Sequence, residues 1–330
     1  MEMLKKSWRP LLALLLIFIL IEKGPFDPKQ LQFILTQPKI LILGFVIFFL
    51  QFVLFSLRWQ LFINLICKLH FRKIMELSLI GLFFNLFVPG GVGGDIVKAL
   101  ELSKNDEISR SQGLATVLSD RVFGLFSMVT MSLLFLISEY LREPNTYVSK
   151  LAFLSLVLFC GMTFCLLFLP QIFTKLSSYL NNRNTPIMLK FEKFISTLHF
   201  TFITFKYVKL QGKSFLLSFL SQLLAIYFMY QVVLALGTEP PSFLIFFSLS
   251  CFGFVAAALP IMPGGIGVGQ YAFFVMFSHI SEELGKASVS AITTLQIFTL
   301  FYALIGGLIF AFMPKLPPKT AELILEKEIK

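Results

Sequence analysis

The chain has 330 residues, of which 57% are hydrophobic and only 14% are charged. A water-soluble fold could not cover so much apolar surface with polar groups, so the composition predicts an integral membrane protein. The alternating strands of an outer-membrane barrel are not visible, which excludes that class. Basic residues outnumber acidic ones by 28 to 18. In a membrane protein this excess is first a topology signal, and it does not imply nucleic acid.

Helices that cross the hydrocarbon core need about 20 apolar residues. Runs without Asp, Glu, Lys or Arg lie at 40–57, 122–138, 151–169, 214–238 and 287–314. We expect the first helix to continue past Arg58 to Cys67. A shorter run, Leu11–Ile21, lacks a small-x-small cleavage site, so we interpret it as an uncleaved first helix that starts near Trp8. The sequence thus predicts an all-α integral membrane fold with about six spanning helices.

Two further apolar stretches are each broken by a cluster of Pro and Gly. Leu77–Val88 precedes the break at 89–94, and Phe243–Leu259 precedes the break at 263–269. Pro lacks a backbone donor and Gly disfavours helix, so neither helix can run through its cluster. Unsatisfied backbone in lipid costs several kcal/mol per group, so each break must face protein or a wet cavity. This pattern predicts two re-entrant hairpins.

The two breaks share the string Pro-Gly-Gly-(Val/Ile)-Gly, which indicates an internal repeat. We expect one transmembrane domain over 1–330, with pseudo-repeats at about 40–169 and about 214–314. Segments assigned to the cytoplasm carry about 20 Lys and Arg, against about six on the other side. This predicts a multi-pass protein of the cell (inner) membrane with both termini cytoplasmic. The hairpins would then be inverted, with their tips close to the midplane.

The segment 170–213 carries seven Lys and Arg that alternate with apolar residues. It is able to form basic amphipathic helices, which lie in the headgroup layer and favour anionic lipid. Alternatively, it is a charged cytoplasmic linker that only fixes topology. Both interpretations remain open at this point.

The glycine clusters contain neither a Walker motif nor a dinucleotide fingerprint. Their glycines leave backbone N–H groups exposed beside the N-terminus of the next helix, where the dipole favours an anion such as a lipid phosphate. Tight helix packing at small residues is the structural alternative. The candidate positions are Gly90, Gly91, Gly93, Gly264, Gly265 and Gly267.

Polar residues surround the first break. Asn85 precedes it, and Asp95, Lys98 and Glu101 follow it at a spacing that places them on one helix face. For Glu101 we favour a simple salt-bridge ladder. For Asp95 and Lys98, which lie closer to the break, we favour a role in opening the pocket or in binding a headgroup, and we assign Asn85 to the same site.

Asp120 and Arg121 lie within an apolar helix. If that helix starts near residue 112, Arg121 lies roughly 14 Å along it, close to the bilayer centre. A charge at this depth normally faces a partner or a cavity, and the planar guanidinium suits a phosphate. The alternative is a structural arrangement that pairs Arg121 with Asp95 and Asp120 with Lys98. Arg58 is expected to snorkel to the cytoplasmic interface.

The second half offers fewer polar groups. Gln270 directly follows the second glycine cluster, and we assign it to the binding site. The histidines are scattered, and the four cysteines lie singly in apolar runs without a metal-ligand spacing. We therefore expect no catalytic residue, no metal and no cofactor.

Three motifs carry a family resemblance: Asn85 to Asp95 with Lys98, Asp120 to Gly124, and Pro260 to Gly267. They resemble the lysylphosphatidylglycerol synthase/flippase transmembrane domain family, over essentially the whole chain. The resemblance implies a lipid translocator. In the best-known members this domain flips an aminoacylated phosphatidylglycerol and is fused to a soluble aminoacyl-transferase domain, which this sequence lacks, so lysyl transfer is not expected.

The chain departs from the family pattern at two positions. Gly91 stands where the family usually has Arg, and Gln270 stands where it usually has Glu. The second change removes an ionisable group, which points away from proton coupling at that position and towards a different headgroup.

The leading hypothesis is a flippase-like transporter that moves a phosphate-bearing lipid between leaflets through a central polar cavity. The lipid would be a phospholipid, aminoacylated or not, or a polyprenyl phosphate, and its headgroup anionic or zwitterionic. Two alternatives remain: a membrane-embedded transferase that uses a lipid-linked donor, with Asp95 or Asp120 as base, and a membrane docking partner that binds a soluble synthase through 170–213. A homo-oligomer is left open.

Overall fold

The computed structural model describes residues 27–87, 92–104, 108–180, 208–259 and 262–312. Within these ranges the chain is helical and forms no strand, as the sequence predicts. In chain order the elements are α2 (Pro28–Leu35), α3 (Pro38–Ile63), α4 (Phe71–Phe87), α5 (Gly93–Leu102), α6 (Arg110–Arg142), α7 (Thr146–Leu180), α9 (Val208–Ala235), α10 (Phe243–Ala257), the 3₁₀ turn η2 (Pro263–Gly265), α11 (Val268–Ser278) and α12 (Glu282–Phe312).

Five of these helices, α3, α6, α7, α9 and α12, are long and apolar enough to cross a membrane. Each of them covers all or most of one of the five long runs that the sequence singles out, although α9 ends at Ala235, before the predicted end at 238. This confirms an all-α integral membrane protein. The helix α3 ends at Ile63, before the predicted end at Cys67. The expected first helix at Leu11–Ile21 lies outside the described residues.

The basic segment 170–213 is divided between two long helices and a stretch outside the described residues. The helix α7 continues to Leu180, and α9 begins at Val208. Both ends of the segment therefore extend neighbouring spanning helices, while residues 181–207 are not described.

Each Pro-Gly break separates two short helices that pack against each other in opposite directions. In the first pair, Gly94 of α5 lies against the backbone of Gly81 in α4, and the Lys98 side chain lies against Gly81 as well. In the second pair, the rings of Phe254 and Phe273 are 5.3 Å apart. Both breaks therefore form helical hairpins, α4–α5 and α10–α11.

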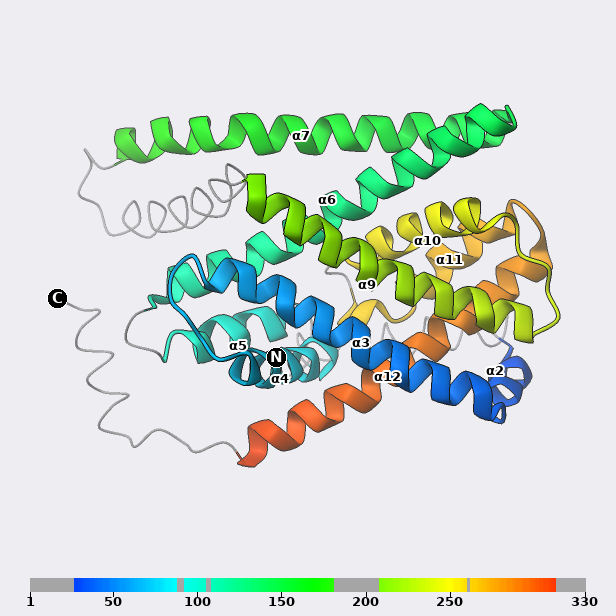
Figure 1. The fold of residues 1–330 in the computed structure, drawn as a ribbon, viewed down its shortest axis with the longest axis horizontal. Helices are drawn as coiled ribbons and strands as arrows, with labels where there is room; N and C mark the ends of the chain where they lie inside the picture. The colour runs from blue at the N-terminus through cyan, green and yellow to red at the C-terminus, as the bar shows by residue number, and fades with distance from the viewer. Residues whose placement is uncertain (1–26, 88–91, 105–107, 181–207, 260–261, 313–330) are drawn as a thin grey trace, which may run out of the picture.

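The two hairpins lie towards opposite ends of the bundle, with η2 between them (Figure 1). At the end where α4 and α5 lie, α3 ends and α6 begins, whereas α9 ends and α12 begins at the other end. The tips meet, because a Cβ atom on Gly264 would collide with Leu86 near the end of α4. The inverted arrangement expected from the repeat is thus confirmed for the described parts of both hairpins.

The second break has a backbone that requires glycine. Gly264, Gly265 and Gly267 have φ angles of 59°, 68° and 87°, in the left-handed region that residues with a Cβ rarely adopt. A Cβ on Gly265 would also come within 2.6 Å of the Ala257 carbonyl oxygen. The tight reversal of the chain at this point therefore depends on residues without a side chain.

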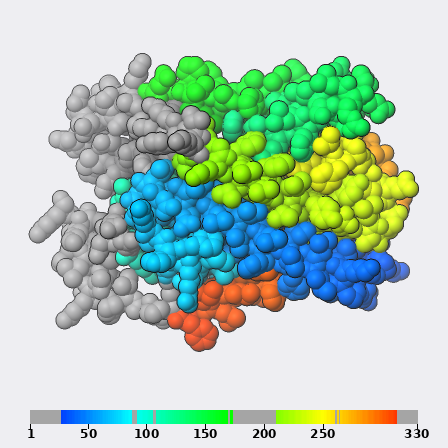
Figure 2. Space-filling model, viewed as in Figure 1, coloured from blue at the N-terminus to red at the C-terminus, as the bar shows by residue number. Residues whose placement is uncertain are grey.

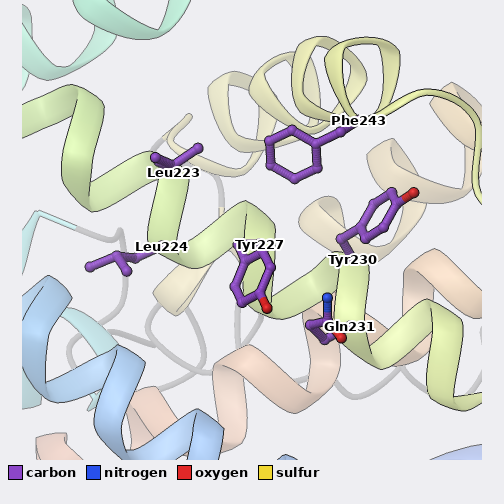
Figure 3. Close-up of a pocket in the computed structure, with 6 residues that line it drawn as sticks. All are labelled: Leu223, Leu224, Tyr227, Tyr230, Gln231 and Phe243. Carbon is purple, nitrogen blue, oxygen red and sulfur yellow. The ribbon is translucent and has the colours of Figure 1, made fainter.

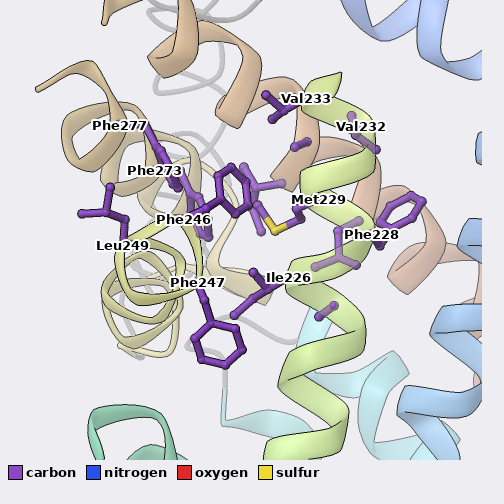
Figure 4. Close-up of a cluster of buried hydrophobic side chains, with 14 of the residues drawn as sticks. Ile226, Phe228, Met229, Val232, Val233, Phe246, Phe247, Leu249, Phe273 and Phe277 are labelled. Atoms are coloured by element: carbon purple, nitrogen blue, oxygen red, sulfur yellow. The ribbon is translucent and has the colours of Figure 1, made fainter. Parts of the chain in front are cut away.

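A large aromatic and aliphatic cluster joins α9 to the second hairpin (Figure 4). The rings of Phe246 and Phe277 lie 4.8 Å apart, and those of Phe273 and Phe277 are stacked at 6.1 Å. Inside a membrane the hydrophobic effect does not drive helices together, so close van der Waals packing of this kind must do so. This cluster fixes the second hairpin against the long helices.

The helices differ in how far they are covered by the rest of the protein. The side chains of α3 and α9 meet over the middle of the face shown in Figure 2, where the two helices pack side by side. By contrast, α7 lies along one edge of the bundle in Figure 1 and exposes large apolar side chains such as Phe153, Phe164 and Leu167. Such a surface suits contact with lipid chains.

The packing of α12 on α4 gives a test of the fold. A Cβ on Gly306 would overlap the backbone carbonyl oxygen of Leu79. We expect Gly306→Ala to lower the free energy of unfolding by about 1–3 kcal/mol, because the backbone of α4 would have to move. In α7, a Cβ on Gly161 would meet nothing within 4 Å, so Gly161→Ala serves as the matched control. The measurement is unfolding in detergent, and equal effects of the two changes would contradict the close contact of α4 with α12.

Candidate functional site

Arg58 of α3 has the lowest exposed fraction of the charged residues that the structure describes, and its partner is Asp120 of α6. Arg58 Nε and Nη2 donate to the two carboxylate oxygens of Asp120 at 2.7 and 3.0 Å, a bidentate geometry. Arg58 Nη1 also donates to Ser218 Oγ of α9 at 2.9 Å. The guanidinium, with 7% of the side chain exposed, thus joins three long helices at one point.

This pair corrects two expectations. Arg58 does not snorkel to the interface, and Asp120 binds Arg58 instead of Lys98. The guanidinium fits because Gly124 lacks a side chain: a Cβ there would lie 2.9 Å from Nη1. The Phe55 ring, 5.1 Å from the guanidinium carbon, adds a cation–π contact. Arg58 is the site residue that the sequence interpretation missed, although its place inside an apolar helix was visible.

A second ion pair joins Arg121 of α6 to Asp95 of α5 through Nε and Oδ2. It corresponds to one half of the structural arrangement considered from the sequence. The Arg121 side chain is 34% exposed, against 10% for Asp95. Asp95 lies in the first turn of α5, where the helix dipole also favours a negative charge. Of the two guanidinium groups, Arg121 is therefore the more accessible.

Lys98 lies one helical turn after Asp95, between α3 and α4. Its Nζ is 4.4 Å from the centre of the Trp59 ring. Its methylene groups pack on Gly81, where a Cβ would come within 2.7 Å of them. Among the described residues, no carboxylate lies within ion-pair distance of Lys98. The ammonium group is instead held by the face of an indole, which is a weaker compensation for a buried cation.

Side-chain amides satisfy the backbone where each hairpin turns. Asn85 Oδ1 accepts a hydrogen bond from the Gly94 N–H at 2.9 Å, at the start of α5. Gln270 Oε1 accepts one from the Gly267 N–H at 2.7 Å, at the start of α11. The other end of Gln270 donates to Gln296 Oε1 at 2.6 Å. Both amides thus cap the second helix of a hairpin.

A cavity of about 350 Å³ lies where the two hairpin tips and the long helices meet. It is lined by Phe55, Arg58, Leu82, Asn85, Leu86, Arg121, Gly124, Leu125, Met128, Ala257, Ala258, Leu259, Met262, Gly264, Gly265 and Thr299. Its volume falls within the range of small-molecule sites. The two guanidinium groups and the glycine backbone of η2 are its main polar features.

The cavity gathers some of the predicted site residues and not others. Four predicted residues line it: Asn85, Arg121, Gly264 and Gly265. Two more, Asp95 and Asp120, reach it indirectly, because each binds one of its arginines. Four others do not line it, namely Gly93, Lys98, Gly267 and Gln270. Gly90 and Gly91 lie outside the described residues.

A second cavity of about 360 Å³ lies between α9 and the start of α10 (Figure 3). Leu223, Leu224, Tyr227, Tyr230, Gln231 and Phe243 line it. Figure 3 shows Phe243 close to Tyr230, and the centres of their rings are 5.4 Å apart. None of its lining side chains is charged, so it is not suited to a phosphate. Within the described residues, no cluster of three or more His, Cys, Asp or Glu could hold a metal ion.

Comparison with known proteins identifies relatives over the whole chain. The family model "Lysylphosphatidylglycerol synthase TM region" matches residues 7–307. A UPF0104 membrane protein of Methanothermobacter thermautotrophicus is 22% identical over 96% of both chains. Another of Pyrococcus horikoshii is 23% identical over 93% of this chain and 96% of its own. One of Methanocaldococcus jannaschii is 29% identical, but over only 50% of this chain and 53% of its own. No solved structure matches.

The Arg58–Asp120 pair should be essential for stability. Arg58→Met would leave a buried carboxylate uncompensated, and we expect it to lower the free energy of unfolding by about 3–5 kcal/mol. Arg72, whose side chain is 91% exposed beside Glu76, is the control. We expect Arg72→Met to change the free energy of unfolding by less than about 1 kcal/mol. Unfolding in mixed micelles measures both. The double change Arg58→Met with Asp120→Leu should recover much of the loss, and a double variant as unstable as the sum of its parts would contradict the pairing.

Proposed function

The chain belongs to the lysylphosphatidylglycerol synthase TM region family, and we propose that this multi-pass membrane protein moves a phosphate-bearing lipid between leaflets through the cavity at the hairpin tips. The lipid would be a phospholipid, aminoacylated or not, or a polyprenyl phosphate. The transported headgroup would enter the cavity while its apolar chains stay in the bilayer. We place the protein in the cell membrane with both termini in the cytoplasm.

One observation carries this proposal: Arg121 lines a cavity that lies where two inverted hairpins meet. A guanidinium remains charged at any physiological pH and forms bidentate hydrogen bonds with phosphate. Sites at the interface of inverted repeats, built from broken helices, are typical of transporters that work by alternating access. Gly264 and Gly265 of the second hairpin line the same cavity, so both hairpins contribute to it.

The transferase alternative receives less support from the geometry. It needs Asp95 or Asp120 as a general base, and both carboxylates are bound to guanidinium groups. The oxygens that would have to accept a proton from a substrate are therefore already engaged by arginine N–H donors. We therefore propose a non-enzymatic protein. The docking alternative depends on 170–213, most of which lies outside the described residues.

The role of Arg121 is tested by reconstitution into vesicles with a fluorescent phosphatidylglycerol, where reduction of the outer-leaflet label reports transbilayer movement. We expect the protein to accelerate this movement. Arg121→Gln should reduce the rate at least about tenfold, because the phosphate loses its bidentate partner. Arg142→Gln is the matched control, since Arg142 lies on the same helix with 71% of its side chain exposed.

Two results would contradict the proposal. If the intact protein does not accelerate the transbilayer movement of any phospholipid or polyprenyl phosphate, the proposed transport function is wrong. If it does so and Arg121→Gln behaves like Arg142→Gln, the cavity is not the route.

A further inference from the structure

The two arginines of the cavity are held in different ways. Arg58 is bound at all three of its nitrogens, to both oxygens of Asp120 and to Ser218, and only 7% of its side chain is exposed. Arg121 meets Asp95 through Nε and exposes 34% of its side chain. Both arginines line the cavity, but the Arg121 side chain is much more exposed than that of Arg58, so the Arg121–Asp95 pair is the one that a ligand is able to reach.

Asp95 has a second cation within reach along its own helix. Lys98 follows it by three residues in α5, the spacing at which oppositely charged side chains meet on a helix surface. In the structure Lys98 Nζ lies instead over the Trp59 ring at 4.4 Å. Asp95 thus stands between two cations and is engaged by only one of them.

The charge balance of the region favours one further anion. Among the described side chains, three cations lie together here: Arg58, Lys98 and Arg121. Two described carboxylates, Asp95 and Asp120, pair with the arginines, so these groups carry one more positive than negative charge. The stretches 88–91 and 260–261, which lie outside the described residues, contain no charged residue, so they add no charge to this balance. Buried charges are stable only when paired, and a singly charged phosphodiester would complete the set.

We propose that Asp95 occupies on Arg121 the position that a ligand phosphate takes, and that an arriving phosphate displaces Asp95 to Lys98. In the structure Asp95 neutralises Arg121, and Lys98 lies over the Trp59 ring. When a phosphate binds Arg121, the Asp95 carboxylate moves one turn along α5 to Lys98. Every charge is paired in the second state, and Asp95 is a positioning residue that sets the affinity. This inference rests on the proposed function.

A double-mutant cycle tests the exchange. Binding of dihexanoyl phosphatidylglycerol to the full chain in detergent is measured by calorimetry, with dihexanoylglycerol as the ligand that lacks phosphate. Asp95→Asn removes the internal competitor, so the dissociation constant should fall about tenfold, which is about 1.4 kcal/mol. Lys98→Met removes the alternative partner of Asp95, so the constant should rise about tenfold.

The combined variant gives the decisive result. In Asp95→Asn there is no carboxylate for Lys98 to pair with when the phosphate binds. The double variant Asp95→Asn with Lys98→Met should therefore bind phosphatidylglycerol as tightly as Asp95→Asn alone, within about twofold. If Lys98→Met weakens binding equally in both backgrounds, Lys98 contacts the phosphate itself and the proposal is overturned. Glu101→Gln, on the same helix but paired with Lys104, is the control and should leave affinity unchanged.

Trp59 offers a readout that a purely structural role of Asp95 would not move. The chain has only two tryptophans, so Trp8→Phe isolates Trp59. Phosphatidylglycerol should shift the Trp59 emission as Lys98 leaves its ring, and this shift should disappear in Asp95→Asn. If Asp95→Asn fails to fold, Asp95→Ala replaces it in both experiments. An emission shift that persists without the carboxylate overturns the exchange.

Two further arms separate this inference from the proposed function. If the intact protein binds no phosphatidylglycerol, both are wrong. Glycerophosphoglycerol has the same phosphodiester without acyl chains. If it binds as tightly as the lipid, and its affinity changes in the same way in the Asp95 and Lys98 variants, lipid transport is overturned while the exchange at Asp95 stands. If lipid binds but Asp95→Asn does not tighten binding, only the exchange is overturned.

Discussion

The structure depends on the way in which a small number of buried charges is paired inside an apolar helix bundle. In a medium of low polarity an unpaired ion is unstable, so each charged side chain dictates which helices must meet. Arg58 shows this most clearly, because it draws Asp120 of α6 and Ser218 of α9 to α3. Asp95 then draws the first hairpin to α6 through Arg121. The centre of the protein is therefore arranged by ion pairs, and apolar packing fills the space around them.

The hairpins solve a related problem for the backbone. A helix that ends inside a membrane exposes N–H groups that no water satisfies. Asn85 accepts from Gly94 in one hairpin, and Gln270 accepts from Gly267 in the other. In both hairpins a side-chain amide caps the second helix. Asn85 does so from the first helix of its hairpin, whereas Gln270 belongs to the helix that it caps. These amides explain why polar residues stand beside both glycine clusters.

The sequence predicted what depends on local composition. Long apolar runs predicted the spanning helices, and Pro-Gly clusters predicted both hairpins, because these features need only the chain immediately around them. It failed for Arg58, whose partners lie 62 and 160 residues away, since its local pattern resembles an interfacial anchor. Gln270 was assigned to the site from its position after the glycines, yet it faces Gln296 and not the cavity. Where a side chain points depends on packing between distant helices.

The cavity is asymmetric, and this asymmetry follows from the two halves. All of its charge comes from α3 and α6, whereas the second hairpin contributes apolar side chains and the glycines of η2. Residues 240–281 contain no Asp, Glu, Lys or Arg. The second hairpin is therefore able to change its position without breaking an ion pair. Movement of the first hairpin must separate Asp95 from Arg121, so an anion that replaces this carboxylate removes the main electrostatic resistance to that movement.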